Sequence, residues 1–157
     1  AWPKRIVYEE GGLRDRTIFT GPVAGDPVKE LAIVDPYGAA GDRGRRMIAD
    51  FARILIGDGR GVEPVRLVAF DAESVELHRN ETSDIQYEHM LECWQKTFAG
   101  GPPLQFVQVS KRGNRQLHDR EVRVTTRSGR TLIWDIGRGI AGVMTALYQC
   151  TVVLTEE

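Results

Sequence analysis

Short runs of β-branched and aliphatic residues alternate along this chain with two long segments in which apolar residues recur at helical spacing. The spacing predicts helices over 41–56 and 83–98, and charged residues such as Arg45 are expected mostly on the solvent side of the first. The apolar runs predict strands over 5–8, 17–20, 31–34, 65–70, 104–110, 120–126, 131–136 and 149–154. Gly11-Gly12 indicates a hairpin between the first two strands. Strands that alternate with long helices are typical of an α/β fold, here a mixed β-sheet flanked by α-helices.

With 157 residues, of which 41% are hydrophobic, the sequence is long enough for one domain over 1–157. It begins with Ala-Trp-Pro rather than Met, which indicates a domain excised from a longer protein, and it leaves open whether residues 1–30 belong to the same fold. No apolar run approaches the ~20 residues of a membrane span, so no transmembrane segment is expected. Cys93 and Cys150 have no CxxC partner and are expected to be buried, reduced thiols of a cytoplasmic protein.

Charge is distributed unevenly along the chain. The whole sequence has a net charge of −1, which is far from the strongly basic balance of a protein that coats nucleic acid. Segment 111–138 nevertheless holds eight basic and three acidic residues, a net charge of +5. Such a segment either attracts a phosphate-bearing partner or is a hairpin whose arginines keep a sheet edge soluble.

Two short motifs in and after this segment could bind an anion. In His118-Asp119-Arg120 the imidazole could act as nucleophile or acid and Arg120 as a bidentate clamp, although a surface ion cluster explains the same residues. The segment 137–142 matches GxGxxG, but too few residues follow it for a dinucleotide-binding domain. The backbone of Gly137 and Gly139 beside Arg138 predicts a small anion-binding nest instead.

Asp35 directly follows the apolar run 31–34, at the end of a strand where α/β proteins often bind ligands. The alternative is a turn capped by Asp35, with Tyr37 packed beneath it. Both interpretations place the carboxylate near the end of a central strand.

Metal binding is not expected. His78, His89 and His118 are scattered, and no pair of them has the spacing of metal ligands. The sequence therefore predicts neither a metal nor another cofactor.

Three stretches occur in an order that resembles a known family: 31–37 (Leu-Ala-Ile-Val-Asp-Pro-Tyr), 117–122 (Leu-His-Asp-Arg-Glu-Val) and 136–140 (Ile-Gly-Arg-Gly-Ile). Together they resemble the phospholipase-D-like domain found C-terminal to MIT (microtubule-interacting and transport) domains, over about residues 30 to 154. The chain departs from that pattern at Ala141, where the family often has an acid. The resemblance implies a phospholipase-D-like fold, a homodimer and binding of acidic phospholipids, and for bacterial relatives a place in conflict or defence systems.

Active phospholipase D enzymes carry HxKxxxxD and a downstream GSxN, usually in two copies. Here His118 occupies the histidine position, but Arg120 stands in the lysine position and Thr125 in the aspartate position, and no GSxN follows. A phosphoryl-histidine route needs a second acid for the leaving group, which one chain with one such histidine does not supply. We therefore expect binding without hydrolysis.

The leading hypothesis is a non-catalytic domain that recognises the phosphate of a lipid headgroup or a nucleic acid, in the cytoplasm or at a membrane surface. The predicted ligand-binding residues are His118, Arg120, Arg138, Asp35, Gly137 and Gly139. One alternative is a dimeric phosphodiesterase or nuclease that uses His118. The other is a protein–protein interaction or dimerisation module.

Overall fold

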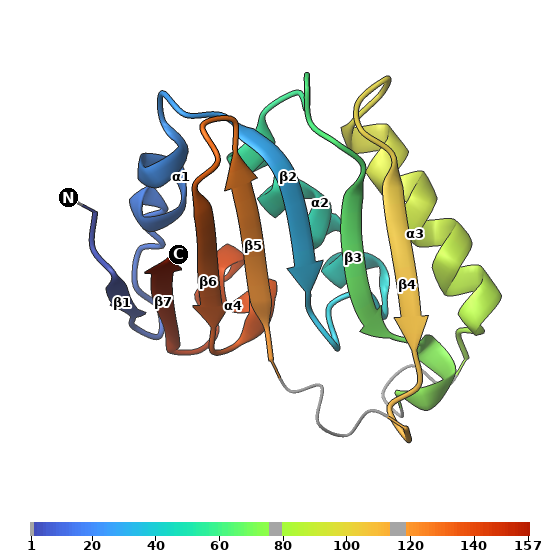
Figure 1. Cartoon of the computed structure of the whole chain (residues 1–157). Coiled ribbons are helices and arrows are strands. Elements are labelled where there is room, and N and C mark those ends of the chain that lie inside the picture. The colour runs from blue at the N-terminus through green and yellow to red at the C-terminus, as the bar shows by residue number, and fades with distance from the viewer. Residues whose placement is uncertain (1, 76–79, 114–118) are drawn as a thin grey trace.

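The computed structural model describes residues 2–75, 80–113 and 119–157, and this part of the chain forms a mixed seven-stranded sheet with four α-helices (Figure 1). The elements in chain order are β1 (Arg5–Tyr8), α1 (Thr17–Val23), β2 (Val28–Val34), α2 (Asp42–Ile56), β3 (Val65–Phe70), the 3-10 turn η1 (Ala72–Ser74), α3 (Ser83–Thr97), β4 (Leu104–Val109), β5 (Glu121–Thr126), β6 (Thr131–Ile136), α4 (Gly139–Met144) and β7 (Cys150–Glu156). The predicted α/β class with a mixed sheet is confirmed.

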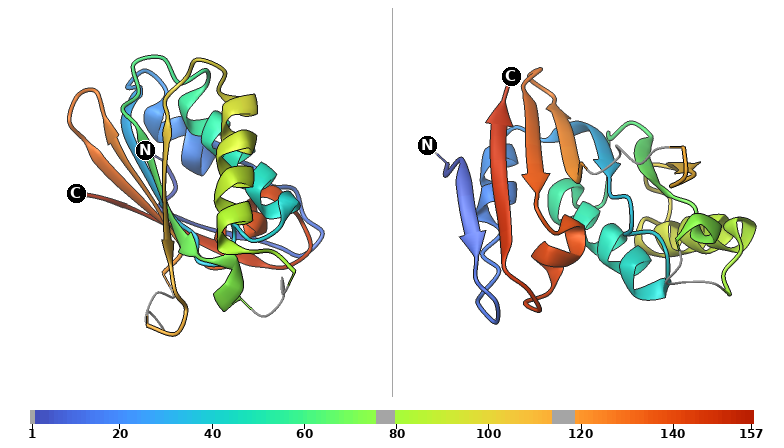
Figure 2. Two further views of the ribbon diagram at one scale, coloured as in Figure 1. Left: turned by 90° about the vertical axis from the view of Figure 1, so that its right-hand side faces the viewer. Right: turned by 90° about the horizontal axis from the view of Figure 1, so that it is seen from below.

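The strand order is β1-β7-β6-β5-β2-β3-β4. β2, β3 and β4 are parallel to one another. On the other side of β2, every pair of neighbouring strands is antiparallel: β2 with β5, β5 with β6, β6 with β7, and β7 with β1. Helices α1 to α4 all lie against the same face of this sheet (Figure 2). The core therefore forms between that face and the helices, where residues such as Ile33, Phe51 and Trp134 are buried.

Most predicted elements agree with the structure. The predicted strands over 5–8, 65–70 and 131–136 have the observed bounds, and both predicted helices are present within a few residues. The local pattern was sufficient for these elements because their apolar residues form a run or stripe within the element itself.

The strand predicted over 17–20 is wrong, because these residues begin helix α1. Their β-branched side chains favour a strand locally, but tertiary packing decides otherwise: Ile18 and Phe19 are fully buried, and the Phe19 ring lies edge-on to Phe51 with 5.1 Å between the ring centroids. The Asp15 carboxylate accepts a hydrogen bond from the N–H of Thr17, the first residue of the helix, at 2.9 Å.

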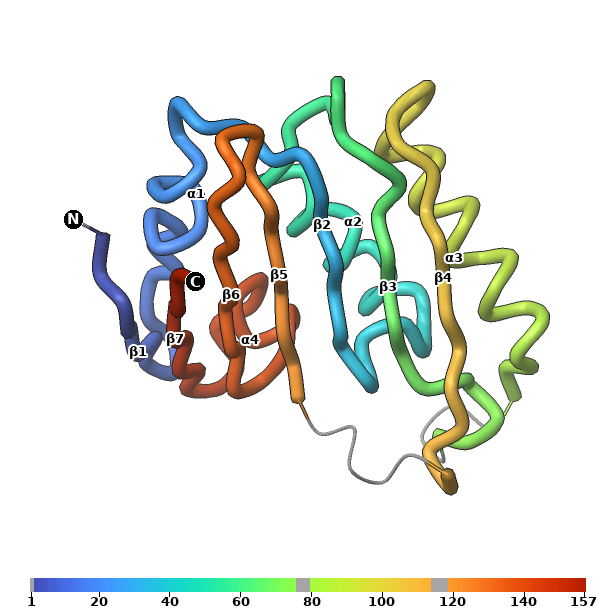
Figure 3. Tube along the Cα trace, in the orientation of Figure 1, coloured from blue at the N-terminus to red at the C-terminus, as the bar shows by residue number. Residues whose placement is uncertain are grey.

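The predicted hairpin at Gly11-Gly12 is also wrong. β1 pairs antiparallel with β7, the last strand of the chain, so the two ends of the chain lie side by side at one edge of the sheet (Figure 3). The question left open for residues 1–30 is thereby answered for the described ones, since β1, α1 and the start of β2 all belong to this fold.

Arg45 is not on the solvent side of α2, as the sequence predicted, but buried. Its guanidinium forms ion pairs with Glu81 at 2.6 Å and with Asp42 at 2.8 Å, and it donates to the carbonyl oxygen of Ala39 at 3.0 Å. Because Ala39 belongs to the loop that follows β2, Arg45 anchors this loop against α2. Helical spacing could not reveal the burial, since only Asp42 belongs to the helix, whereas Ala39 comes from the preceding loop and Glu81 from beyond β3.

Candidate functional site

The ends of several strands meet at one edge of the sheet, which we call the carboxyl edge. β2, β3, β4 and β6 end there, and the antiparallel strands β5 and β7 begin there (lower edge in Figure 1). Asp35 directly follows β2, Arg120 directly precedes β5, and the 137–139 turn follows β6. The strand order thus brings together residues that are about a hundred positions apart in sequence.

The Asp35 carboxylate is enclosed at this edge. Its side chain is buried, and Oδ2 accepts a hydrogen bond from the Ile140 N–H at 3.0 Å. Burial raises the pKa of Asp35, while the Ile140 N–H and the charge of Arg120 act in the opposite direction. The N–H that the glycine-rich turn could have offered to an anion is therefore used by a carboxylate of the protein itself, and Asp35 orients the turn.

Gly139 permits this arrangement. Its φ is +68°, in the left-handed region, and a Cβ added there would lie 2.9 and 3.0 Å from the two carboxylate oxygens of Asp35 and 3.1 Å from Cδ of Arg120. Only glycine combines this backbone conformation with so close an approach. Gly139 thus serves the packing of the turn, and it is buried rather than exposed to a ligand.

Arg120, which directly precedes β5, forms a hydrogen bond with the same turn. Its Nη1 donates to the carbonyl oxygen of Gly137 at 3.2 Å, and its guanidinium lies 6.0 Å from the centre of the Tyr37 ring. The side chain is only partly buried. Arg120 therefore links the turn after β6 with the loop after β2 while keeping solvent contact.

Arg138, the residue that follows Gly137, is exposed. Its guanidinium lies 5.0 Å from the centre of the exposed Tyr148 ring. Its backbone N–H donates a hydrogen bond to the sulfur of Cys150. Burial is the chief cause of the raised pKa of this thiol. Of the two predicted arginines, Arg120 thus bonds to the turn and Arg138 belongs to it, and each lies beside an aromatic ring.

Lys111 completes the positive groups that the structure places here. It follows β4, and its Nζ lies 5.4 Å from the centre of the Tyr37 ring. Its backbone N–H donates to the hydroxyl of Ser74 at 3.1 Å, which fixes the chain after β4. The sequence counted Lys111 among the basic residues but could not pair it with Tyr37, and nothing in the sequence singled out Tyr148.

Arg14 holds the loop that carries Tyr148. Its guanidinium donates to the carbonyl oxygens of five residues, at distances from 2.5 to 3.3 Å: Glu9, Gly12, Gly142, Thr145 and Tyr148. The loop between α4 and β7 is therefore tied to the loop between β1 and α1. Tyr148 keeps a fixed backbone while its ring remains exposed.

His118, the predicted nucleophile or ligand, lies outside the described residues. Among the residues that the structure describes, no group of three or more His, Cys, Asp and Glu side chains could hold a metal ion. Cys93 and Cys150 are both free thiols, Cys150 buried and Cys93 half-buried.

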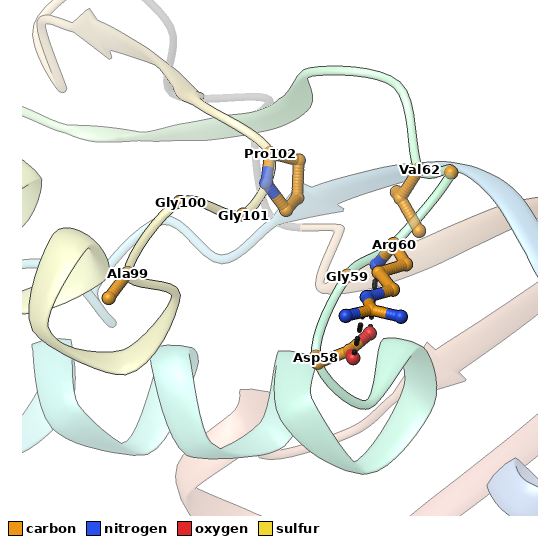
Figure 4. A pocket seen from close by; sticks show the side chains of 9 residues that line it. Asp58, Gly59, Arg60, Val62, Ala99, Gly100, Gly101 and Pro102 are labelled. Carbon is orange, nitrogen blue, oxygen red and sulfur yellow. Dashed lines mark hydrogen bonds and ion pairs between the residues drawn. The ribbon is translucent and has the colours of Figure 1, made fainter.

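A cavity of about 570 Å³ lies at the opposite edge of the sheet, between two glycine-rich loops, 57–62 and 99–102 (Figure 4). Its charged groups are Asp58 and Arg60, which pair with each other at 3.5 Å and are both highly exposed. Because it contains none of the predicted residues and no unpaired charge among its lining residues, we do not assign the site to it.

Comparison with known proteins gave no match to a protein-family model and none to a curated protein. In the described part of the chain, no helix combines the length and the apolar character that crossing a membrane requires.

Proposed function

We propose that this chain is a non-catalytic phospholipase-D-like domain that recognises anionic phosphate groups at the carboxyl edge through Arg120 and Arg138. The observation that carries the proposal is that the guanidinium group of Arg120 bonds to the turn that contains Arg138, and neither arginine forms an ion pair with a carboxylate of the described residues. Arg45 and Arg130, by contrast, are each paired with two carboxylates. Guanidinium groups without such partners can bind phosphate oxygens in a bidentate manner.

Binding without hydrolysis fits the chemistry of the motif. Arg120 and Thr125 stand where the active family has lysine and aspartate. Asp35, which could otherwise have oriented an imidazole, is buried and accepts the Ile140 N–H. A phosphoryl-histidine route needs an oriented imidazole and a second acid, and Asp35 is not free to orient an imidazole.

The expected affinity favours a ligand with several phosphates. Each charge-assisted hydrogen bond contributes about 1.5–3 kcal/mol before the cost of association is subtracted. Two arginines are therefore too few for tight binding of a single phosphate ion. A polymer or a membrane surface presents many phosphates. Once one phosphate is bound, the neighbouring phosphates are at a high effective concentration for the second arginine.

The test compares the double variant Arg120→Ala/Arg138→Ala with the charge-matched control Arg60→Ala/Arg127→Ala at the opposite edge. The probes are vesicles of phosphatidylserine and phosphatidylcholine and an oligothymidylate of about 12 nucleotides. We expect the first variant to lose at least tenfold, or about 1.4 kcal/mol, in affinity for the probe that binds, and the control to lose much less. Arg138→Ala alone, which removes an exposed side chain, reports the effect without disturbing Asp35.

Thermal unfolding of each variant separates binding from structure. A double variant that melts at a lower temperature but binds as the unaltered protein does would mean that the arginines serve an interaction module or the fold itself. Equal loss in the control would assign the effect to overall charge. Either result, or no binding of either probe, refutes the proposed function.

A further inference from the structure

Three cations and two aromatic rings follow one another along the carboxyl edge, in the order Lys111, Tyr37, Arg120, Arg138, Tyr148, and we call them the ring-and-cation row. Lys111 and Arg120 lie 5.4 and 6.0 Å from the centre of the Tyr37 ring. Arg120 bonds to the carbonyl oxygen of Gly137, the residue before Arg138, and Arg138 lies 5.0 Å from the Tyr148 ring. Five separate segments of the chain thus contribute to one continuous row.

Both rings are accessible to a ligand. Tyr148 is 58% exposed and Tyr37 is 37% exposed, although Tyr37 has the Phe70 ring packed edge-on against it at 5.3 Å. Arg14 holds the backbone of Tyr148 by a hydrogen bond to its carbonyl oxygen. The protein therefore holds the backbone of Tyr148 and leaves both rings in contact with solvent.

We propose that the row binds single-stranded nucleic acid, with bases stacked on Tyr37 and Tyr148 and phosphates held by Lys111, Arg120 and Arg138. The inference rests on the proposed function and names its ligand class. A single strand presents both rings and phosphates, as the row presents both rings and cations, and base stacking on aromatic side chains beside cations is the usual way such strands are bound. A duplex cannot use the rings in this way because its bases stack on one another.

Charge favours a strand over a membrane as the partner. The protein as a whole has a net charge of −1, so a broad anionic surface meets its acidic parts as well as the row. A short strand contacts only the row, and charges more than about 8 Å away are screened at physiological salt. The feature that would favour a membrane is the pair of exposed leucines nearby, Leu13 (95%) and Leu147 (56%), and the test includes them.

The experiment measures fluorescence anisotropy of a labelled oligothymidylate of about 12 nucleotides, and of an abasic strand of the same length and charge. Tyr148→Leu keeps an apolar side chain but removes the ring, and Tyr148→Phe keeps the ring. We expect Tyr148→Leu to weaken thymidylate binding at least about fivefold, the lower limit for loss of one stacked base, and Tyr148→Phe to leave it nearly unchanged. The abasic strand should bind the unaltered protein at least about fivefold more weakly than thymidylate and should not respond to Tyr148→Leu.

Salt dependence counts the phosphate contacts. Three cations predict that the logarithm of the association constant falls with the logarithm of salt concentration with a slope of about −2. Arg138→Ala should make this slope shallower by about 0.7. Leu147→Ala, which removes an exposed side chain outside the row, should change neither the slope nor the affinity.

The results distinguish this inference from the proposed function. If both strands bind equally well and lose affinity in Arg120→Ala/Arg138→Ala, while Tyr148→Leu has no effect, phosphate recognition stands and the assignment to single strands is refuted. Tighter binding to phosphatidylserine vesicles than to thymidylate, reduced by Leu13→Ala/Leu147→Ala, refutes it in favour of a membrane. Equal affinity for a duplex of the same length also refutes it. If no phosphate probe binds, both proposals fall.

Discussion

Gly139→Ala tests how tightly the carboxyl edge is packed around Asp35. At φ +68° an alanine costs about 1–2 kcal/mol more than glycine in backbone energy. The new methyl group would also lie 2.9 and 3.0 Å from the Asp35 carboxylate oxygens and 3.1 Å from Arg120 Cδ, closer than ordinary contact. Overpacking of this kind costs about 1–3 kcal/mol, so the free energy of unfolding should fall by about 2–5 kcal/mol in total.

Gly100→Ala is the matched control. Gly100 has a φ of +73°, and a Cβ added there meets nothing within 4 Å, so this variant should show only the backbone cost. Both substitutions restrict the unfolded chain equally, so this contribution cancels when the two variants are compared.

Urea unfolding followed by tryptophan fluorescence measures both free energies, and the melting temperature should fall by about 2–4 °C for each kcal/mol lost. We expect Gly139→Ala to be less stable than Gly100→Ala by about 1–3 kcal/mol. A difference below about 0.5 kcal/mol, the usual spread of surface substitutions, would refute the close packing of Gly139 against Asp35.

Two further predictions concern the groups that support this edge. Arg45→Ala leaves Glu81 without its buried partner and should lower the free energy of unfolding by about 3–5 kcal/mol in urea titrations, and a loss below about 1 kcal/mol would contradict the role of Arg45 as an anchor. Because burial raises the pKa of Asp35 above its ordinary 3.8, the folded state binds a proton there more tightly than the unfolded state does. The unaltered protein should therefore lose stability relative to Asp35→Asn as pH rises from about 4 through the pKa of the folded state. Unfolding titrations of both proteins across this range would show a constant difference if the reasoning were wrong.

The elements of this fold could largely be predicted from local sequence. The runs at 65–70 and 131–136 are strands with the predicted bounds, because burial of one sheet face leaves a pattern that is visible within six residues. The strand predicted over 17–20 is wrong because contacts with residues remote in sequence stabilise a helix there. The Phe19 ring packs against Phe51, and the Trp134 indole N–H donates to the carbonyl oxygen of Ile18 at 2.9 Å.

The candidate site could be predicted in part. Asp35, Arg120 and the 137–139 turn were named from short motifs, and the structure brings them together. Tyr148 had no signal in the sequence, because its significance comes from Arg138 across a helix and a loop. Burial of Arg45 was missed for the same reason, since Glu81 and the carbonyl oxygen of Ala39 lie outside the helix.

Sequence alone determined the alternation of strands and helices, the positive charge of segment 111–138 and the glycines of the turn, because each depends on residue type and on near neighbours. Tertiary structure decided that the Ile140 N–H beside the turn bonds to Asp35, and that three cations and two rings share one edge. The reason is that strand order and direction determine which chain ends become neighbours. In this sheet they bring the end of β2, the start of β5 and the end of β6 to the same edge.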